Sequence, residues 1–253
     1  MRPTARQERI LAIIAEQGRA SVEALADLLG TSRETVRRDL TLLGNRGLLR
    51  KVHGGATRLN FGVEDSFTER MQFRRAEKLR IGRAAADLFT PGNSLLVDTG
   101  STTIYFAEAL KAKTGLTVVT NSSRIAQLVA QSQGSNEIYQ IGGRYTREGD
   151  QSLGPLALEQ IRQFRADHAV LTIGAVDSAG RFMDYDADEA SVARLMMACA
   201  ERTTILVDES KLGRTALFPV CDAGQVDRIV TNAQLPGALA HILQQADVEV
   251  IQA

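Results

Sequence analysis

The residues best suited to chemistry form a short polar run at 98–103, with the sequence Asp-Thr-Gly-Ser-Thr-Thr. The run follows an apolar stretch that predicts a strand and leads into one that predicts a helix. Its three helix-start hydroxyls can donate hydrogen bonds, its glycine lets a ligand approach the backbone, and a helix N-terminus favours negative charge. We therefore expect a phosphate-binding turn that lacks the lysine of a Walker loop. The alternative is that these hydroxyls only cap the helix.

Small and polar residues also follow other predicted strands, at 120–123 (Thr-Asn-Ser-Ser), 141–143 (Ile-Gly-Gly), 173–175 (Ile-Gly-Ala) and 208–211 (Asp-Glu-Ser-Lys). In an open parallel sheet such positions share the edge where ligands bind. Lys211 adds a cation suited to a phosphate monoester. The candidate effector-binding residues at this edge are Asp98, Gly100, Ser101, Thr102, Thr103, Asn121, Gly142 and Lys211.

Alternating strand and helix patterns predict the parallel sheet that positions these groups. We expect strands near 94–98, 116–120, 137–141, 169–173, 204–208, 228–230 and 248–251, and helices at 78–89, 102–110, 122–132, 155–164, 189–200 and 237–245. Apolar strands that alternate with helices indicate a Rossmann-like α/β domain, whose mainly parallel sheet is covered on both faces. This effector-binding domain is expected over 78–253, after a linker of mixed charge at 59–77.

Residues 31–40 predict a helix whose cationic side chains point away from its core face. Thr31 and Glu34 have the spacing of a capping box, which places the helix start near Thr31. At about 100° per residue, an apolar stripe runs from Val36 to Leu43 on one side. The arginines lie around the opposite side, where they can contact bases in a DNA groove.

The neighbouring segments complete a winged helix-turn-helix domain over residues 1–58. A helix over 21–29 begins at the capping residue Ser21 and ends at Gly30, and helix, tight turn, helix is the helix-turn-helix pattern. Residues 47–58 predict a two-stranded hairpin, or wing, that turns at glycines beside basic residues. The candidate DNA-binding residues are Thr31, Ser32, Arg33, Thr35, Arg37, Arg38, Lys51, His53 and Arg58.

The charge distribution supports a basic DNA-binding domain. The whole chain has 30 Lys and Arg and 30 Asp and Glu. Residues 1–58 contain 11 basic and 6 acidic side chains, whereas the remainder contains 19 and 24. Lys and Arg that neutralise phosphates provide the sequence-independent part of DNA affinity. The acidic remainder is expected to stay off the duplex.

Other classes of protein are less compatible with the sequence. No stretch approaches the roughly 18 apolar residues of a membrane span, and the N-terminus lacks the apolar run of a secretory signal, so we expect a cytoplasmic protein without membrane contact. Cys199 and Cys221 lack the spacing of a zinc site and are expected to be reduced thiols. The sequence predicts no cofactor, no metal and no catalytic residue.

The motifs together resemble the DeoR family of bacterial transcriptional regulators. They are 35–40 (Thr-Val-Arg-Arg-Asp-Leu), 53–56 (His-Gly-Gly-Ala), 98–103, 120–122 (Thr-Asn-Ser), the Gly142–Gly143 pair, Gly154 and 208–214 (Asp-Glu-Ser-Lys-Leu-Gly-Arg). The resemblance covers nearly the whole chain. It implies a winged helix-turn-helix followed by a sensor related in fold to ribose-5-phosphate isomerase. It also implies a phosphorylated sugar or polyol as effector, with repression as the usual output.

A sugar-phosphate isomerase-like enzyme is the alternative function, because the implied sensor fold is that of an isomerase. Enediol isomerisation needs a positioned base and groups that stabilise an oxyanion. The resemblance places the catalytic glutamate at about Ala193, and no lysine occurs between Lys113 and Lys211. The family pattern therefore implies that the phosphate site is kept and the proton-transfer groups are lost.

Two features leave alternatives open. The acidic run Asp184, Asp186, Asp188 and Glu189 can bind sugar hydroxyls or form a solvated turn and helix start, so Asp186 and Glu189 are additional candidate effector contacts. The arginine that often follows the Gly-Gly pair in the family is displaced, with Arg144 and Arg147 as candidates.

We predict a homo-oligomeric repressor of a carbohydrate or polyol catabolic operon. Its expected partners are double-stranded operator DNA, a phosphorylated sugar or polyol that releases the protein from that DNA, and further copies of the chain. A DNA-organising protein without a ligand is disfavoured, because it leaves the strand-end motifs unexplained.

Overall fold

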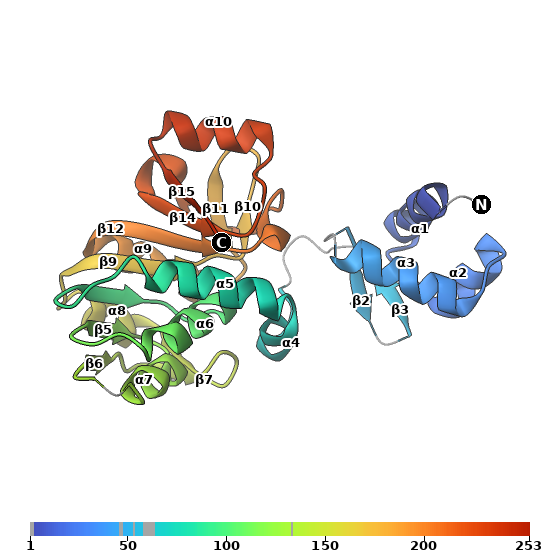
Figure 1. The fold of residues 1–253 in the computed structure, drawn as a ribbon. Coiled ribbons are helices and arrows are strands. Elements are labelled where there is room, and N and C mark those ends of the chain that lie inside the picture. Colours follow the sequence, from blue (N-terminus) through green and yellow to red (C-terminus); the bar gives the residue numbers. More distant parts are fainter. Residues whose placement is uncertain (1–2, 46–47, 53, 58–63, 133) are drawn as a thin grey trace. The chain divides into compact units, whose positions relative to one another are not determined.

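The computed structural model describes residues 3–45, 48–52, 54–57, 64–132 and 134–253 (Figure 1). The chain divides into two compact units, Met1–Phe61 and Gly62–Ala253. Each has its own hydrophobic core. Among the described residues, no helix has the combination of length and apolarity needed to cross a membrane.

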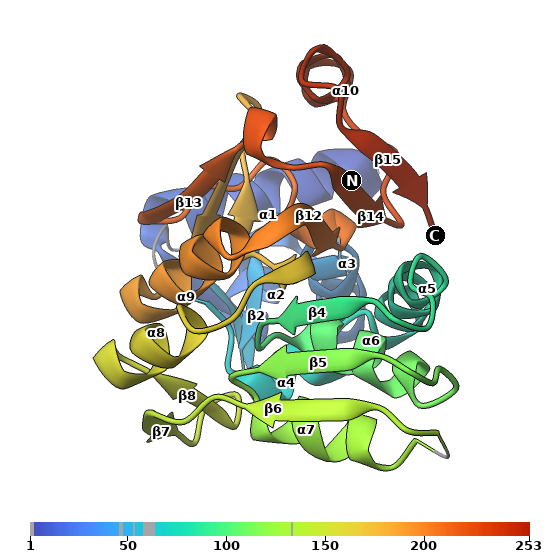
Figure 2. The same ribbon diagram turned by 90° about the vertical axis from the view of Figure 1, so that its left-hand side faces the viewer.

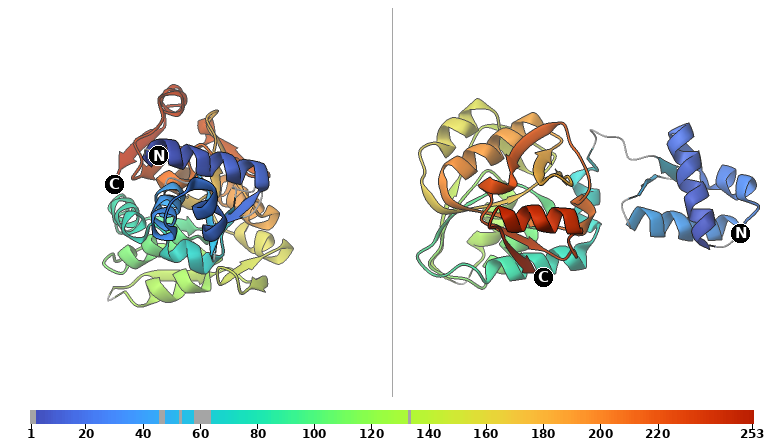
Figure 3. Two further views of the ribbon diagram at one scale, coloured as in Figure 1. Left: turned by 90° about the vertical axis from the view of Figure 1, so that its right-hand side faces the viewer. Right: turned by 90° about the horizontal axis from the view of Figure 1, so that it is seen from above.

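The first unit packs short helices against a small sheet (Figure 3). Its elements are α1 (Pro3–Gln17), β1 (Arg19–Ser21), α2 (Val22–Leu29), α3 (Arg33–Asn45), β2 (Arg50–Val52) and β3 (Gly55–Thr57). The core contains the predicted stripe of α3, since Val36, Leu40 and Leu43 are all buried. Helix, turn, helix and wing follow one another as the sequence predicts.

The turn between α2 and α3 is fixed by capping. Ser21 Oγ accepts a hydrogen bond from Ala24 N (3.1 Å) at the start of α2, as predicted. Gly30 ends α2 in the left-handed conformation (φ 58°), which glycine adopts without steric cost. The helix-turn-helix geometry therefore follows from local residue choices at both ends of α2.

The predicted capping box of Thr31 and Glu34 is wrong. The N–H of Thr31 donates to Ala26 O (3.0 Å) and so helps to end α2. Ser32 caps α3 instead, because its Oγ accepts from Thr35 N (3.2 Å). Because the Thr31 N–H is used at the end of α2, the N-cap of α3 is Ser32, one residue further along the chain.

The wing belongs to a three-stranded sheet with the order β1-β3-β2, whereas the sequence predicts two strands. β1 pairs antiparallel with β3, with Ala20 opposite Ala56. A Cβ on Gly55 would lie 2.2 Å from Ala20 O, so the glycine is required by the close approach of β1. A three-residue strand is too short to show a period in the sequence.

The second unit contains a seven-stranded sheet with the order β15-β14-β12-β9-β4-β5-β6 (Figure 2). Every pairing in this sheet is parallel across the part of the chain described. Its strands are β4 (Ser94–Val97), β5 (Thr117–Thr120), β6 (Glu137–Gln140), β9 (Ala166–Thr172), β12 (Ala200–Val207), β14 (Arg228–Thr231) and β15 (Glu249–Gln252). The expected Rossmann-like architecture is observed.

Helices cover both faces of this sheet. The helices are α5 (Arg75–Ala86), α6 (Ser101–Leu110), α7 (Ser123–Ala130), α8 (Pro155–Ile161), α9 (Ala187–Ala198) and α10 (Gly237–Gln245). Successive strand residues alternate between two cores. Leu95 and Val97 pack with α5, α6 and α7, and Leu96 packs with α8 and α9. Burial on both faces explains the apolar runs of the central strands, such as residues 95–97 of β4 and 205–207 of β12, whereas the edge strands β6 and β15 are mostly exposed.

Short antiparallel elements, which the sequence pattern does not reveal, are added to this frame. β10 (Ala175–Val176), β11 (Arg181–Asp184) and β13 (Phe218–Asp222) form one small sheet. β7 (Arg144–Thr146) pairs with β8 (Gln151–Leu153). The 3-10 helices η1 (Glu209–Lys211) and η2 (Ala223–Gln225) complete the unit. These segments bring side chains to the sheet edge, as described below.

The expected linker at 59–77 needs correction, because much of it is part of the second unit. α4 (Phe67–Gln72) begins with a capping box between Ser66 and Glu69. Phe67 is buried in the core with α5 and α6. The Tyr105 hydroxyl donates to Met71 O (2.7 Å). The mixed charges that suggest a linker are therefore carried on packed helices.

Candidate functional site

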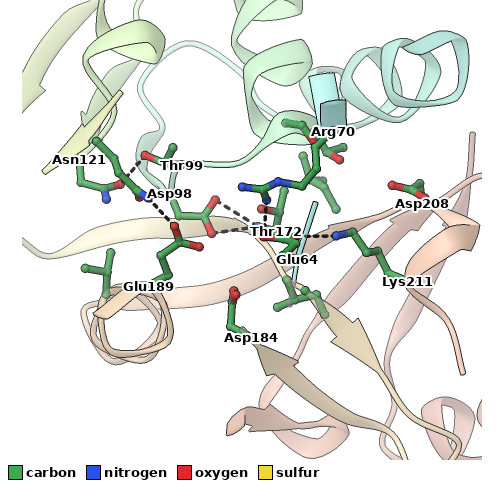
Figure 4. A pocket seen from close by; sticks show the side chains of 17 residues that line it. Glu64, Arg70, Asp98, Thr99, Asn121, Thr172, Asp184, Glu189, Asp208 and Lys211 are labelled. Carbon is green, nitrogen blue, oxygen red and sulfur yellow. Dashed lines mark hydrogen bonds and ion pairs between the residues drawn. The ribbon is translucent and has the colours of Figure 1, made fainter. Parts of the chain in front are cut away.

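A polar pocket lies at the carboxyl ends of β4, β5, β9 and β12 (Figure 4). The turn from β4 to α6, Asn121 after β5, Thr172 at the end of β9 and Lys211 after β12 line it. Parallel strands point their carboxyl ends to one edge, so the strand-end residues meet there. Of the ten predicted effector-binding residues, those that line the pocket are Asp98, Ser101, Thr102, Asn121, Glu189 and Lys211.

Gly100 and Thr103 lie outside the pocket lining and have structural roles. A Cβ on Gly100 would lie 2.0 Å from Thr172 Oγ1, so the glycine makes room for β9 rather than for a ligand. Thr103 is fully buried, and its hydroxyl donates to Gly100 O (3.1 Å).

Gly142 and Asp186 also lie outside the lining. Gly142 N donates to Gln160 Oε1 (2.8 Å), so this N–H is already used by the protein. The Asp186 carboxylate caps α9 by accepting from the backbone N–H groups of Asp188 (2.8 Å) and Glu189 (3.1 Å). It therefore has the helix-start role that the sequence left as an alternative.

The rest of the acidic run is divided between surface and pocket. Asp188 forms an ion pair with Arg144 (Oδ2 to NH2, 2.6 Å), and neither residue lines the pocket. Asp184, at the end of β11, and Glu189, in the first turn of α9, do line it. Gln151 donates to Glu189. The proposed choice between Arg144 and Arg147 for a ligand contact gains no support, since neither is in the lining.

The start of α6 is available to an anion. No side chain caps this helix among the described residues, so its first N–H groups have the polarity that favours negative charge. Thr99 Oγ1 donates to Asn121 Oδ1 (3.3 Å), and Asn121 Nδ2 donates to Ser152 O (3.2 Å). These bonds hold Asn121 beside the turn.

Two cationic side chains of the described residues line the pocket, and both contact Glu64. Lys211 Nζ lies 2.7 Å from Glu64 Oε1, and Arg70 NH1 lies 2.7 Å from Glu64 Oε2 (Figure 4). Burial alone would raise the pKa of Glu64, but the charges of Lys211 and Arg70 lower it below its usual value. Glu64 and Arg70 were missed in the sequence because both fall in the expected linker.

A third cation, Lys78 of α5, lies behind the turn. Its Nζ donates to Ser101 Oγ (2.9 Å) and to Arg70 O (2.6 Å). Burial lowers the pKa of Lys78 to about 8. Burial would raise the pKa of Asp208, but the charges of Lys78 and Lys211 lower it below its usual value. Lys78 is thus a structural partner of the pocket that sequence spacing did not indicate.

A second part of the pocket wall is acidic and consists of Asp98, Asp184 and Glu189. Both oxygens of Asp98 accept from Thr172 N (3.1 and 3.0 Å), and burial raises the pKa of Asp98 well above its usual value. Burial, followed by the charge of Glu189, raises the pKa of Asp184 to about 8. Burial, followed by the charge of Glu64, raises the pKa of Glu189. Carboxyl groups of this kind can donate as well as accept hydrogen bonds to ligand hydroxyls.

Glu64, Asp184 and Glu189 each offer an oxygen within 4.8 Å of the others, a spacing that could hold a divalent cation. Lys211 and Arg70 already supply positive charge to Glu64. Because these two cations already balance the charge of Glu64, the arrangement is better suited to binding another anion in place of Glu64 than to binding a metal.

The first unit presents a basic surface on α3. Arg33, Arg37 and Arg38 are exposed, as are Ser32 and Lys51. The expected contacts Thr31 and Thr35 are half-buried at the same end of the helix. His53 and Arg58, two further expected DNA contacts, lie outside the described residues.

Contacts within the unit orient this surface. Lys51 Nζ of the wing donates to Thr41 Oγ1 of α3 (3.0 Å). The buried Asp39 carboxylate accepts from Gln7 Nε2 (3.0 Å) and pairs with Arg6 of α1. The side of α3 opposite the arginines is therefore anchored by both charge and apolar packing.

A winged helix-turn-helix joined to an α/β unit with a polar pocket at its strand ends defines a DNA-binding regulator with a ligand sensor. Residues 6–60 match the DeoR-like helix-turn-helix domain, and residues 74–233 match the DeoR C terminal sensor domain. The chain belongs to the DeoR family of transcriptional regulators.

Named relatives are similar over almost the whole chain. The HTH-type transcriptional repressor CsqR of Escherichia coli is 33% identical over 246 residues, which cover 97% of this chain and 94% of the relative. The glycerol-3-phosphate regulon repressor of Haemophilus influenzae is 30% identical over 251 residues, covering 99% and 97%. The chain is accordingly a transcriptional regulator and not an enzyme.

The solved structures include a distant match to ribose 5-phosphate isomerase A from Methanocaldococcus jannaschii. It has a TM-score of 0.39 and 17% identity, and covers 53% of each chain. The family assignment rests on the sequence matches.

Proposed function

We propose that this protein represses a carbohydrate or polyol catabolic operon and leaves its operator when a phosphorylated sugar or polyol binds the strand-end pocket. The observation that carries the proposal is the convergence of Lys211, Arg70 and the uncapped start of α6 on one pocket. These are the groups that bind a phosphate monoester. A relative named for glycerol 3-phosphate supports this class of effector.

The rest of the pocket suits the unphosphorylated part of such a ligand. Asn121 offers an amide, while Asp184 and Glu189 offer carboxyl groups. Sugar and polyol hydroxyls both donate and accept hydrogen bonds, so they match this mixture. We therefore propose that the phosphate lies towards Lys211 and α6, and the hydroxyl groups towards β11 and α9.

The proposed DNA contacts come from α3 and the wing. Arg37 and Arg38 read base edges in the major groove, and Lys51 contacts the phosphate backbone. Thr31, Ser32, Arg33, Thr35, His53 and Arg58 are proposed as supporting contacts. A helix-turn-helix protein that binds two half-sites needs two recognition helices at a matching spacing, so we propose a homodimer or higher oligomer. Because the protein binds operator DNA in this proposal, we also propose that it is cytoplasmic.

The test is a thermal-shift screen of the full-length protein with sugar and polyol phosphates, including glycerol 3-phosphate, each beside its dephosphorylated form. A ligand that binds only the native state raises the apparent stability. We expect one phosphate compound to raise the melting temperature and to weaken operator binding. Its dephosphorylated form should do neither.

A substitution locates the site. Lys211→Ala should weaken binding of that compound about tenfold or more, since it removes a charge-assisted hydrogen bond. Operator affinity of the effector-free variant is measured beside it, as a check on the DNA-binding unit. Lys111→Ala, which removes an exposed ion pair with Glu108, is the matched control. An unchanged response in Lys211→Ala, or equal binding of the dephosphorylated compound, would place the phosphate site elsewhere.

A further inference from the structure

Glu64 bridges the two cations of the pocket with both of its carboxylate oxygens. One oxygen lies 2.7 Å from Lys211 Nζ and the other 2.7 Å from Arg70 NH1 (Figure 4). The side chains of Glu64 and Lys211 are 15% exposed and that of Arg70 is 16% exposed, so water screens these pairs only in part. A carboxylate held by a lysine and an arginine uses the same donors as a phosphate group.

A second anion cannot join Glu64 at low cost. Asp98, Asp184 and Glu189 line the same pocket, and burial raises the pKa of each. The pocket thus disfavours additional negative charge while Glu64 is in place. If Glu64 leaves, Lys211 and Arg70 become free to pair with a different anion. Glu64 and a bound phosphate are therefore alternatives.

The space in the pocket leads to the same conclusion. The free cavity volume is small, about 20 Å³. A phosphate that pairs with both Lys211 and Arg70 needs the place of the Glu64 carboxylate, so Glu64 must move before it can bind there. The Asp98 carboxylate is fixed at its strand end, because both of its oxygens accept from the backbone N–H of Thr172. Glu64 instead comes from an irregular segment, residues 64–66, before α4.

The position of Glu64 in the chain gives its displacement a consequence. The boundary between the two compact units lies between Phe61 and Gly62. Glu64 therefore anchors the first described segment of the sensor after the DNA-binding unit. Loss of this anchor moves the first fixed contact of the sensor further along the chain. The connection between the units then becomes longer, which lowers the effective concentration of a second recognition helix at its half-site and so weakens operator binding.

We propose that Glu64 is an internal competitor of the effector: it neutralises Lys211 and Arg70 in the free sensor, and the effector's phosphate displaces it and releases the segment that leads to the DNA-binding unit. This inference rests on the proposed function, because it requires that the pocket binds a phosphate.

The first test compares Glu64→Gln with the wild type as full-length proteins, with inorganic phosphate as the probe. The amide keeps the shape of the side chain but cannot neutralise the two cations. We expect Glu64→Gln to bind phosphate at least about tenfold more tightly in calorimetric titrations, because the competing charge is absent. It should also bind operator DNA more weakly without any ligand. Glu108→Gln removes an exposed carboxylate that pairs with Lys111 (3.0 Å) and should change neither property.

The second test uses the wild type alone and does not depend on how the variant folds. Amide hydrogen exchange over residues 64–66 should become faster when inorganic phosphate binds, while the start of α6 becomes more protected. Faster exchange reports that the anchored segment has been released.

The outcomes separate this inference from the proposed function. If the wild type binds phosphate, but Glu64→Gln binds it no more tightly and exchange over 64–66 does not rise, Glu64 is not a competitor and the phosphate pocket stands. If neither protein binds inorganic phosphate or any compound of the phosphate panel, both proposals are overturned.

Discussion

Lys78 shows how one buried side chain can hold a functional site together. It is 2% exposed and comes from α5, yet its ammonium group donates to Ser101 at the start of α6 and to the carbonyl of Arg70 in α4. It also stabilises the charge of Asp208. The lysine therefore fixes the proposed phosphate turn relative to the segment that carries Arg70.

Replacing Lys78 should destabilise the sensor. Lys78→Met keeps the apolar stem but leaves Ser101 and the Arg70 carbonyl without this donor. It also removes a charge that stabilises the ionised form of Asp208. Breaking a buried charged contact in this way costs about 3 kcal/mol in the free energy of unfolding. Urea denaturation of the sensor transition measures it. Lys111→Met, at a position with an exposed ion pair, is the control, and an equal effect of the two substitutions would show that the buried contacts contribute little.

Asp184 should make the stability of the sensor depend on pH. Burial, then the charges of Glu189 and Glu64, raise its pKa to about 8, whereas an unfolded aspartate has a pKa of about 4. Between these values the folded state binds more protons than the unfolded state, so this contribution to stability is full below pH 4 and is lost as the pH rises to about 8.

Asp184→Asn should therefore flatten the loss of stability between about pH 5 and pH 8, because the amide does not ionise. Chemical denaturation at several pH values in this range measures the slope. Asp188→Asn alters an exposed carboxylate paired with Arg144 and serves as the control. A slope that is the same in Asp184→Asn and in the wild type would mean that Asp184 is ionised throughout.

Within the single element α3, the residues that stabilise the fold and the residues proposed to contact DNA lie on different faces. Val36, Leu40 and Leu43 are buried, whereas the arginines are exposed; Arg37 has a side-chain exposure of 61%. Within the described residues, Arg37 forms an ion pair on the surface with Glu34 (3.8 Å). Such pairs contribute little to stability, so Arg37 is free to exchange Glu34 for DNA.

Arg37→Ala or Arg38→Ala should weaken specific operator binding by about 1–3 kcal/mol, the effect of losing one bidentate base contact. The melting temperature should hardly change, because both side chains are outside the core. Binding titrations with operator and unrelated DNA at the same salt concentration provide the measurement. Wild-type affinity in both variants would contradict the role of α3 in reading bases.

Lys51→Ala provides a contrast within the same unit. A phosphate contact contributes to every DNA sequence alike, so this variant should lower specific and non-specific affinity together and reduce the salt dependence of binding. A selective loss of operator binding would instead assign Lys51 to base recognition.

For the whole molecule, the sensor is expected to bind a sugar phosphate without transforming it. Isomerisation requires a free base and a group that stabilises the oxyanion. In the free sensor Lys78 donates to Ser101 and Lys211 to Glu64. Burial raises the pKa of Asp184 and of Glu189, which favours their protonated forms.

The purified protein should therefore not interconvert ribose 5-phosphate and ribulose 5-phosphate above the rate in buffer. A coupled spectrophotometric assay with several independent preparations measures this. Turnover that persists in all of them and disappears in Glu189→Ala or Asp186→Ala would reverse the conclusion and make the acidic run a catalytic site.

Local sequence patterns determined the architecture and half of the site. Apolar strands that alternate with helices predict the α/β unit because burial on both faces requires such strands. The stripe from Val36 to Leu43 and the arginines between them predict a DNA-reading helix because helical periodicity assigns each residue to a face. The run at 98–103 predicts a ligand-binding turn because strand ends in parallel sheets meet at one edge.

The tertiary structure alone decided which charges share the pocket. Glu64 meets Lys211 across 147 positions of the chain, and no periodicity relates the two. The contact between Lys78 and Ser101 likewise forms only when α5 packs on α6. The capping box expected at Thr31 was wrong for a local reason, because its N–H donates to Ala26 O at the end of the preceding helix. Periodicity assigns a side chain to a face, whereas ion pairs and competing hydrogen bonds depend on which faces the folded chain brings together.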